Sequence, residues 1–178
     1  MFWQVIDFWF EESDPRDWFR KDPDFDEQLR QRFGQTWQQA VNGELHGWRT
    51  EPLGRLAEVI VLDQFSRNLF RDSPVAFAAD GQALVLAQEA MRQGAEQELT
   101  QIQRNFLYMP FMHSEAPVIH DWALALFKGN GIEASLEAEI RHKAIIDRFG
   151  RYPHRNAVLG RVSTPEELEF LTQPGSSF

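Results

Sequence analysis

The sequence contains no cysteine. Disulfide bonds, thiolate nucleophiles and cysteine-ligated zinc or iron–sulfur sites are therefore excluded, and the fold has to be stabilised by packing alone. The amino terminus, Met1–Asp7, has no basic region ahead of a long apolar stretch, so it does not resemble a secretory signal. These features favour a cytoplasmic location.

The sequence also lacks long apolar runs. The longest, Val59–Leu62 and Trp122–Phe127, are far short of the roughly 20 residues that a membrane span requires. Positive charge is scarce, because 18 Lys and Arg stand against 27 Asp and Glu, which gives a formal net charge of -9. A chain this acidic is repelled by nucleic acids and by anionic membranes, so we expect neither as a partner.

Aromatic residues, in contrast, are plentiful. The 178 residues include 15 Phe and 6 Trp, and 43% of the chain is hydrophobic, which is enough for one self-sufficient core. No Pro-, Gly- or Ser-rich linker divides the chain. We therefore expect a single all-helical domain at residues 1–172, followed by a loose C-terminal tail at residues 173–178. The sequence leaves the oligomeric state open.

Helix start and stop signals recur along the chain. A polar N-cap followed by proline occurs at Asp22-Pro23, Ser73-Pro74 and Thr164-Pro165, and glycines such as Gly129 and Gly150 mark helix ends. These signals predict helices at about residues 2–10, 23–42, 52–69, 74–93, 96–113, 116–128, 132–148 and 165–172. Strand signals are weak. The expected fold class is therefore all-α, an antiparallel array of about eight helices.

Two prolines interrupt the stretch at residues 106–120. Pro110 and Pro117 predict a kink or a helix break there, beside His113-Ser114-Glu115. Polar groups freed at such a break often line pockets. The aromatic and methionine residues before the break are expected in the core, where Tyr108 is the member that presents a hydroxyl.

Sequence motifs of known catalytic chemistry are missing. No Gly-x-Ser-x-Gly elbow is present, and Gly129-Asn130-Gly131 lacks the lysine and the strand context of a phosphate-binding loop. His113, Glu115, His142 and His154 offer nitrogen and oxygen ligands for a metal ion. However, no His-x-x-x-His or Glu-x-x-His pair supports a metal site, so none is predicted, and no cofactor is implied.

Basic residues concentrate in one segment. Residues 141–161 hold six Lys and Arg against one acid, a net charge of +5, and the loop at their centre presents guanidinium, imidazole and amide donors. These donors suit a phosphate or a carboxylate. The residues concerned are Arg148, Arg151, His154, Arg155 and Asn156. An alternative is that the segment docks on the acidic residues 7–27, which carry a net charge of -6.

A second polar group is expected on the helix at residues 52–69. Asp63 and Arg67 are four residues apart on one helical face, which is apolar in its earlier turns, and Asn68 and Arg71 add donors nearby. The pair is either a plain intrahelical ion pair or part of a shared polar centre.

Three segments together resemble a known family. They are Leu62–Arg71, Tyr108–Glu115 and Phe149–Asn156, and the resemblance extends from Val5–Phe10 to Thr164–Glu167. The chain is similar to the bacterial domain-of-unknown-function family numbered 924. This resemblance implies an all-helical fold like tetratricopeptide-type superhelices and no established activity, substrate or cofactor. The chain has Tyr152 where we expect phenylalanine in the family's string.

Two functional hypotheses follow. The first is a binding module that holds a small anion or an acidic peptide terminus through polar residues that converge in a pocket. The candidates are Asp63, Arg67, Asn68, Tyr108, Arg148, Arg151, His154, Arg155 and Asn156. The second is a hydrolase or transferase in which His113 or His142 is the general base, Glu115 or Asp63 orients it, and arginines hold the substrate. A third interpretation is that the polar segments only hold the fold together.

Overall fold

The computed structural model describes residues 1–178, and its regular structure is entirely helical. The α-helices are α1 (Phe2–Asp7), α2 (Pro23–Val41), α3 (Pro52–Ile60), α4 (Ser66–Leu69), α5 (Val75–Ala78), α6 (Asp80–Arg92), α7 (Gln101–Met112), α8 (Pro117–Asn130), α9 (Glu133–Phe149) and α10 (Pro165–Leu171). Two π-helical segments, η1 (Phe8–Glu12) and η3 (Val61–Phe65), continue α1 and α3 without a break. Short 3-10 turns are η2 (His46–Thr50), η4 (Ala95–Glu98) and η5 (Pro153–Arg155).

The expected all-α class and the number of helices are confirmed. When contiguous segments are joined, and α5 is joined to α6 across Ala79, eight helices remain. The N-cap at Asp22 is confirmed, since its carboxylate accepts hydrogen bonds from the backbone of Asp24 and Phe25. The capping box at Thr164 is also present, with reciprocal bonds to Glu167.

One predicted boundary is wrong. The helix expected at residue 96 begins only at Gln101, because Thr100 and Gln103 form a capping box that ends the preceding 3-10 turn. The helix stop expected near Gly129 is confirmed to within two residues, since α8 ends at Asn130 and Gly131 follows in the left-handed conformation with φ 76°.

The predicted helix break is confirmed. Pro110 lies in the last turn of α7, which ends at Met112, and Pro117 begins α8. The residues between the two helices form a short connector, His113–Ala116. The connector is therefore placed by two prolines that the sequence makes conspicuous.

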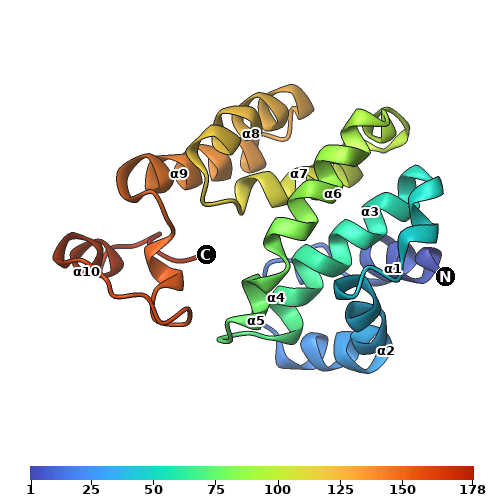
Figure 1. Ribbon diagram of the computed structural model, residues 1–178, viewed down its shortest axis with the longest axis horizontal. Helices are drawn as coiled ribbons and strands as arrows, with labels where there is room; N and C mark the ends of the chain where they lie inside the picture. The colour runs from blue at the N-terminus through green and yellow to red at the C-terminus, as the bar shows by residue number, and fades with distance from the viewer.

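The helices follow one another along the molecule (Figure 1). The continuous helix α3–η3–α4 contacts α1, α2, α6 and α7, and the later helices pack in succession, α6 on α7, α7 on α8 and α8 on α9. Helix α10 lies at the far end of the molecule from the N-terminus and packs against η5. No helix has both the length and the apolar composition needed to cross a membrane.

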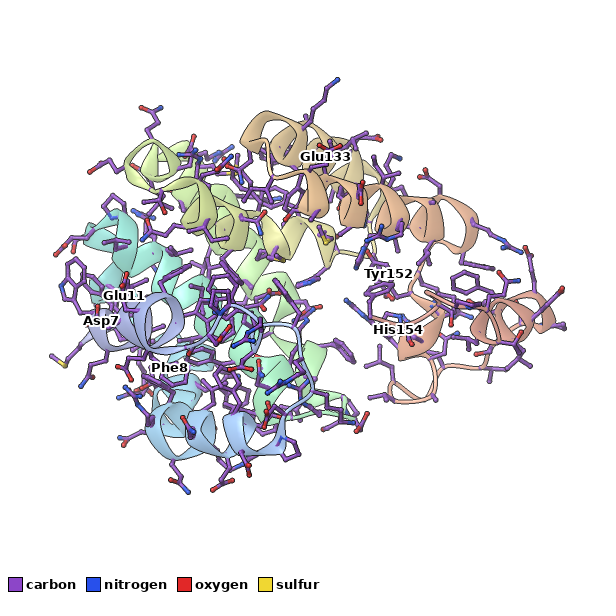
Figure 2. The ribbon with its side chains drawn as sticks, turned by 180° about the vertical axis from the view of Figure 1, so that it is seen from behind. Asp7, Phe8, Glu11, Glu133, Tyr152 and His154 are labelled. Atoms are coloured by element: carbon purple, nitrogen blue, oxygen red, sulfur yellow. The ribbon has the colours of Figure 1, made fainter.

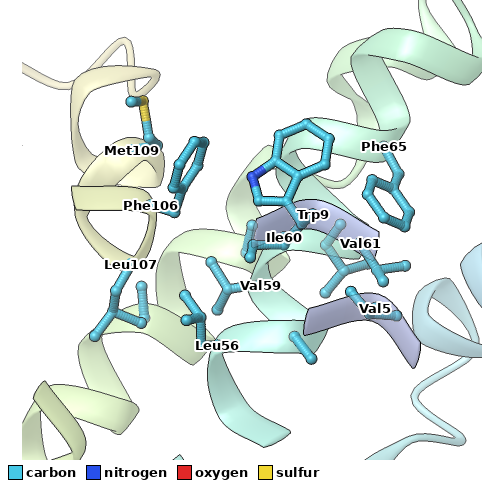
Figure 3. Close-up of a cluster of buried hydrophobic side chains, with 14 of the residues drawn as sticks. Val5, Trp9, Leu56, Val59, Ile60, Val61, Phe65, Phe106, Leu107 and Met109 are labelled. Carbon is cyan, nitrogen blue, oxygen red and sulfur yellow. The ribbon is translucent and has the colours of Figure 1, made fainter. Parts of the chain in front are cut away.

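The main core surrounds the continuous helix α3–η3–α4 (Figure 3). Leu56, Val59 and Ile60 lie on helical spacing and are fully buried, and Trp9 packs on the ring of Phe65 at 5.5 Å between centroids. Each such side chain stabilises the fold by roughly 1.5–3 kcal/mol through burial.

A second, small cluster is made by Ile145, Ile146 and Tyr152. The main cluster includes Met112 at the end of α7 and continues beyond the connector to Ala123 and Phe127 of α8. The two clusters are linked by the hydroxyl of Tyr152, which donates to the carbonyl of Met112.

The C-terminal tail makes contacts. The ring of Phe178 lies 3.8 Å from the imidazole of His142 and 4.6 Å from that of His154, between centroids, while half of the Phe178 side chain stays exposed. The expected limits of the domain, residues 1–172 with a tail at 173–178, stay a prediction.

Candidate functional site

A pocket of about 520 Å³ opens between the α5–α6 segment and the connector. Its apolar wall is made by Pro74, Phe77, Ala78, Leu84 and Leu159. Its polar side is made by Asp80, His113, Ser114, Glu115 and Arg155. The volume is in the range of small-molecule sites, and three of the polar residues come from the connector at the predicted helix break.

The π-helical segment η3 places the acid of the site. Asp63 lies in η3 and is 1% exposed, and Arg67 follows one turn later with its guanidinium 3.2 Å from the Asp63 carboxylate. A π-helical turn is wider than an α-helical one and occurs frequently at functional sites. The Asp63 carboxylate also accepts a hydrogen bond of 2.6 Å from Gln64.

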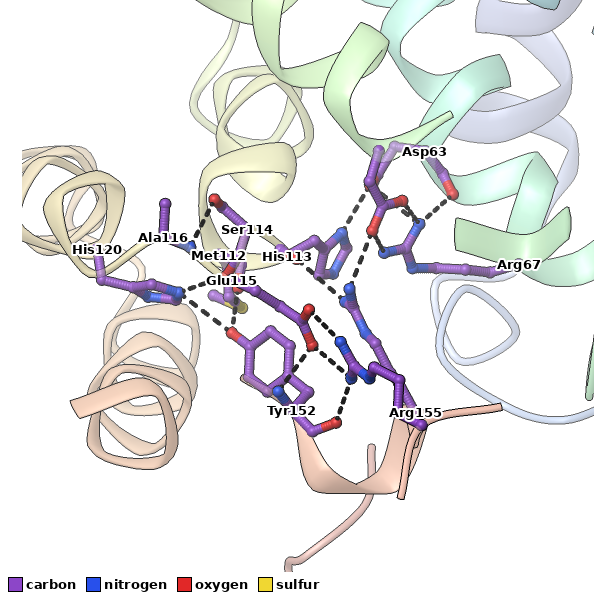
Figure 4. Close-up of polar contacts among 12 residues, drawn as sticks. Asp63, Arg67, Met112, His113, Ser114, Glu115, Ala116, His120, Tyr152 and Arg155 are labelled. Atoms are coloured by element: carbon purple, nitrogen blue, oxygen red, sulfur yellow. Dashed lines mark hydrogen bonds and ion pairs between the residues drawn. The ribbon is translucent and has the colours of Figure 1, made fainter. Parts of the chain in front are cut away.

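The central contact joins this acid to a histidine. His113, the first residue after α7, has Nδ1 2.7 Å from Oδ1 of Asp63 (Figure 4). Because a carboxylate accepts, Nδ1 carries the hydrogen, and the lone pair is on Nε2. Nε2 makes no hydrogen bond within the protein and is not sealed from solvent. His113 lines the pocket with a 13% exposed side chain.

The environment sets the charge of both groups. Burial opposes ionisation of Asp63, but the charge of Arg67 and the hydrogen bonds from His113 and Gln64 outweigh it and hold the pKa of Asp63 well below its usual range. Burial and the charge of Arg67 lower the pKa of His113, against the attraction of Asp63. The pair is therefore an ionised carboxylate beside a neutral imidazole near pH 7, with an acceptor nitrogen at the pocket.

Asp80 joins two arginines at the pocket. Its carboxylate accepts from Arg67 at 2.9 and 3.1 Å and from Arg155 at 3.2 Å. Arg155 has a 6% exposed side chain, and its guanidinium lies over the rings of Phe77 at 4.6 Å and Tyr152 at 4.7 Å. Asp80 could not be predicted from the sequence, because an isolated acid in an amphipathic helix carries no local signal.

The connector is held by hydrogen bonds to its backbone. Three consecutive carbonyl groups accept from side chains of other elements: Met112 from Tyr152 Oη, His113 from Arg155 Nη2 at 3.1 Å, and Ser114 from His120 Nε2 at 2.8 Å (Figure 4). These carbonyls lack helical partners because α7 ends there. The C-terminal loop therefore fixes the segment that carries His113.

His120 itself belongs to a fully buried pair. Its Nδ1 is 2.8 Å from Glu139, and both side chains are 0% exposed. Burial raises the pKa of Glu139, although His120 opposes the shift. His120 has a structural role in this position, since neither nitrogen is left for a ligand.

Glu115 lies at the pocket but does not orient an imidazole. Its carboxylate accepts two hydrogen bonds from Arg161, at 2.6 and 2.9 Å, and one from the backbone of Tyr152 at 2.8 Å. Burial opposes ionisation of Glu115, and the bonds from Arg161 and Tyr152 outweigh it, so its pKa is lowered. Glu115 is thus a structural acid between the connector and the C-terminal loop.

His142, the other candidate base, lies outside the pocket. Its Nδ1 donates to the carbonyl of Ala138 at 2.8 Å, and its ring faces Tyr152 and Phe178. Burial lowers the pKa of His142 to about 3. No acid lies within hydrogen-bond reach of this imidazole.

Two ligand candidates from the earlier helices are also elsewhere. Asn68 donates to Asp26 of α2 at 2.8 Å, and Arg71 binds the same carboxylate. Tyr108 packs edge-on against Phe127 in the main core, and burial raises its pKa. Neither lines the pocket, because their helix faces point at other neighbours.

The basic loop residues are mostly engaged by acids close in the sequence. Arg148 binds Glu166 at 2.8 Å and Arg151 binds Glu167 at 2.6 Å. Both acids lie on helix α10, so neither arginine lines the pocket. The acids that pair with the segment 141–161 are none of those at 7–27, so the alternative docking is wrong.

The remaining two candidates lie in the C-terminal loop. His154 lies beside Tyr152 (Figure 2), with ring centroids 5.7 Å apart and ring planes tilted by 39°, and burial lowers the pKa of His154 to about 4. Asn156 is fully buried, where it accepts from Arg161 and donates to Ser163. Among the nine predicted ligand residues the structure therefore brings Asp63, Arg67 and Arg155 to His113, and does not bring the others.

Comparison with known proteins adds family and fold. Residues 5–175 match a family described as "Bacterial protein of unknown function (DUF924)". The chain belongs to this family. A solved structure, of the protein of unknown function ATU0120 from Agrobacterium tumefaciens, is 38% identical, with 96% of each chain covered and a TM-score of 0.91. None of the curated proteins matches the chain. The DUF924 assignment thus confirms the resemblance and supplies no activity.

Proposed function

We propose that the protein is a hydrolase or transferase that acts on a small molecule in the pocket, with His113 as general base and Asp63 as the residue that orients it. The observation that carries this proposal is the 2.7 Å contact between Nδ1 of His113 and Asp63, with Nε2 left without a partner beside the pocket. A carboxylate that fixes the tautomer of an imidazole is the arrangement of a histidine base.

The chemistry proceeds from the neutral imidazole. His113 Nε2 takes a proton from water or from a substrate hydroxyl, and Asp63 stabilises the imidazolium that forms. The lowered pKa of His113 keeps the base unprotonated near neutral pH. General base catalysis of this kind contributes roughly 10²–10⁴-fold to a rate.

The test is hydrolysis of chromogenic p-nitrophenyl esters and phosphates by the wild-type protein and by His113→Gln. We expect His113→Gln to lower kcat/KM by about 100-fold or more, and Asp63→Asn by about 10-fold or more, because the tautomer is no longer fixed. The matched control is His46→Gln, which changes an exposed histidine outside the pocket.

Turnover that is the same in His113→Gln and wild type, with both proteins folded, would contradict the proposal. Equal losses in His113→Gln and His46→Gln would also do so, since only one of the two lies at the pocket.

A second candidate is the binding of a small anion or an acidic peptide terminus, as predicted from the sequence. What supports it is the position of Arg67 and Arg155 beside His113. Under this hypothesis phosphate or a carboxylate-terminated peptide raises the melting temperature of the wild type but not of Arg155→Gln. An unchanged melting temperature across such compounds counts against it.

Two broader assignments, a tetratricopeptide-like fold and a cytoplasmic location, are also proposals. A tetratricopeptide-like superhelix is supported by the successive packing of α6, α7, α8 and α9. A cytoplasmic location is consistent with the absence of cysteine.

A further inference from the structure

We propose that the pocket selects an uncharged substrate, a carboxylic ester or amide with a short apolar chain. This inference rests on the proposed function, since it names the class of substrate on which His113 acts. It is carried by the charge balance of the pocket, its apolar wall and the two polar groups that are left free.

The formal charges of the ion-paired residues around His113 cancel. Asp63 and Asp80 carry two negative charges, and Arg67 and Arg155 carry two positive ones, and each is ion-paired to the next in the order Asp63, Arg67, Asp80, Arg155. His113 adds no charge, because it is neutral near pH 7. An anion that enters the pocket therefore meets no uncompensated cation, and a cation meets no uncompensated carboxylate.

The third pair at the pocket is balanced in the same way. Both oxygens of Glu115 bind Arg161, at 2.6 and 2.9 Å. The protein as a whole carries a charge of -9, which disfavours anions further.

Arg155 is also held away from a ligand. Its guanidinium lies between the rings of Phe77 and Tyr152, and its donors reach Asp80 and the carbonyl of His113. With 6% of the side chain exposed, Arg155 forms part of the pocket wall. An arginine that binds an anion needs an accessible fork, and here both terminal nitrogens are engaged and Nε is buried without a partner.

The rest of the wall suits an apolar group. Phe77, Leu84 and Leu159 line the pocket with Pro74 and Ala78 beside them. About 520 Å³ is ample for a chain of six carbons with a leaving group. Burying such a chain gains about 0.8 kcal/mol for each methylene group.

Two polar groups remain free at this surface. Nε2 of His113 is an acceptor, and the Ser114 hydroxyl accepts from the backbone of Ala116 at 3.2 Å, so its own hydrogen is available to donate. One acceptor for water and one donor for a carbonyl oxygen match an uncharged ester or amide.

The reaction balances without a further reagent. Nε2 of His113 accepts a proton from water as the water oxygen bonds to the acyl carbon, and the Ser114 hydroxyl donates to the carbonyl oxygen. The bond from the acyl carbon to the leaving oxygen or nitrogen then breaks, and the imidazolium returns the proton to the leaving group. The products are a carboxylic acid and an alcohol or amine.

The experiment compares two matched esters, p-nitrophenyl hexanoate and mono-p-nitrophenyl adipate, which share the leaving group and a six-carbon acyl chain but differ by one terminal carboxylate. Each is tested with the wild type, His113→Gln and His46→Gln. We expect kcat/KM for the hexanoate to exceed that for the adipate by about 10-fold or more after subtraction of the spontaneous rates, and to fall in His113→Gln alone.

The outcomes separate the two proposals. Preference for the adipate, lost in His113→Gln, overturns the uncharged substrate and leaves the proposed function standing. If neither ester is hydrolysed in a way that depends on His113, the proposed function is overturned.

If neither ester shows hydrolysis that depends on His113, a binding measurement still tests the substrate class. The imidazole resonances of His113 are followed by NMR while hexanamide or hexanoate is added. The account predicts a shift with hexanamide at lower concentration than with hexanoate, and no such shift at His46. Stronger binding of hexanoate, or no effect of either compound, overturns the inference.

Discussion

At the scale of single residues, the site depends on which polar groups have hydrogen-bond or ion-pair partners within the protein. Asp63, Arg67 and His113 are each common residue types, and what distinguishes them is a buried carboxylate with three polar neighbours and an imidazole with one free nitrogen. The sequence predicted all three as candidates from helical spacing and from the helix break. It also predicted His142, whose ring finds a backbone carbonyl in place of an acid.

The hydroxyl of Tyr152 is a second residue-scale feature. It donates to the carbonyl of Met112 and lies in a fully buried ring, where we expect phenylalanine in the family's string. Tyr152→Phe should lower the free energy of unfolding by about 1–2 kcal/mol, because the carbonyl loses one partner.

The matched control for this prediction is Tyr108→Phe. The chain has only these two tyrosines, and the hydroxyl of Tyr108 makes no hydrogen bond within the protein. Urea unfolding of both variants checks the difference, and equal effects would show that the bond to Met112 does not stabilise the connector.

Acid sensitivity is predicted for His142. Its pKa is about 3 in the folded protein against 6.5 in the unfolded chain, so between these values the unfolded state binds the extra proton. The stability contributed by neutral His142 is present above pH 6.5 and is lost as the pH falls below it. From pH 7 to pH 5 this side chain alone should account for a loss of about 2 kcal/mol.

The measurement is the pH dependence of unfolding for the wild type, His142→Gln and His46→Gln. His142→Gln should flatten the dependence by that amount, and His46→Gln should leave it unchanged. Parallel curves for the wild type and His142→Gln would refute the assigned burial of this imidazole.

At the scale of elements, the helix ends position the site. The connector between α7 and α8 exists because Pro110 and Pro117 limit the two helices, and its carbonyl groups then recruit side chains from α8 and from the C-terminal loop. Local rules predicted the break itself. They did not predict which side chains bind its carbonyl groups, since those partners are up to 42 residues away.

A close contact between elements gives a further prediction. Gly54 of α3 lies so near η2 that an added Cβ would be 2.0 Å from the carbonyl oxygen of Trp48. Gly54→Ala should destabilise the protein by about 3 kcal/mol or more, because backbone atoms would have to move.

Gly34 of α2 is the control, since nothing lies within 4 Å of a Cβ placed there. Gly34→Ala should stabilise the protein by about 0.5–1 kcal/mol, because alanine restricts the unfolded chain. Thermal unfolding of the two variants should shift in opposite directions, and a harmless Gly54→Ala would contradict the packing of α3 on η2.

At the scale of the whole molecule, the periodicity of apolar residues and the capping signals were sufficient to predict eight helices and most of their bounds. The arrangement of the charges was not predictable in the same way. Arg148 and Arg151 looked like ligand residues because their acids, Glu166 and Glu167, lie on another helix whose position the spacing does not reveal. Asp80 was missed for the same reason, because its role depends on two arginines from different parts of the chain.

The proposed function requires that His113 is a neutral base with its free nitrogen at the pocket, oriented by Asp63. The most direct test is ¹⁵N NMR of the His113 imidazole at pH 7, which distinguishes the tautomers and the protonated form without any substrate. The account predicts a protonated Nδ1 and an unprotonated Nε2, and a loss of this preference in Asp63→Asn. An imidazolium, or a hydrogen on Nε2 in the wild type, would contradict it.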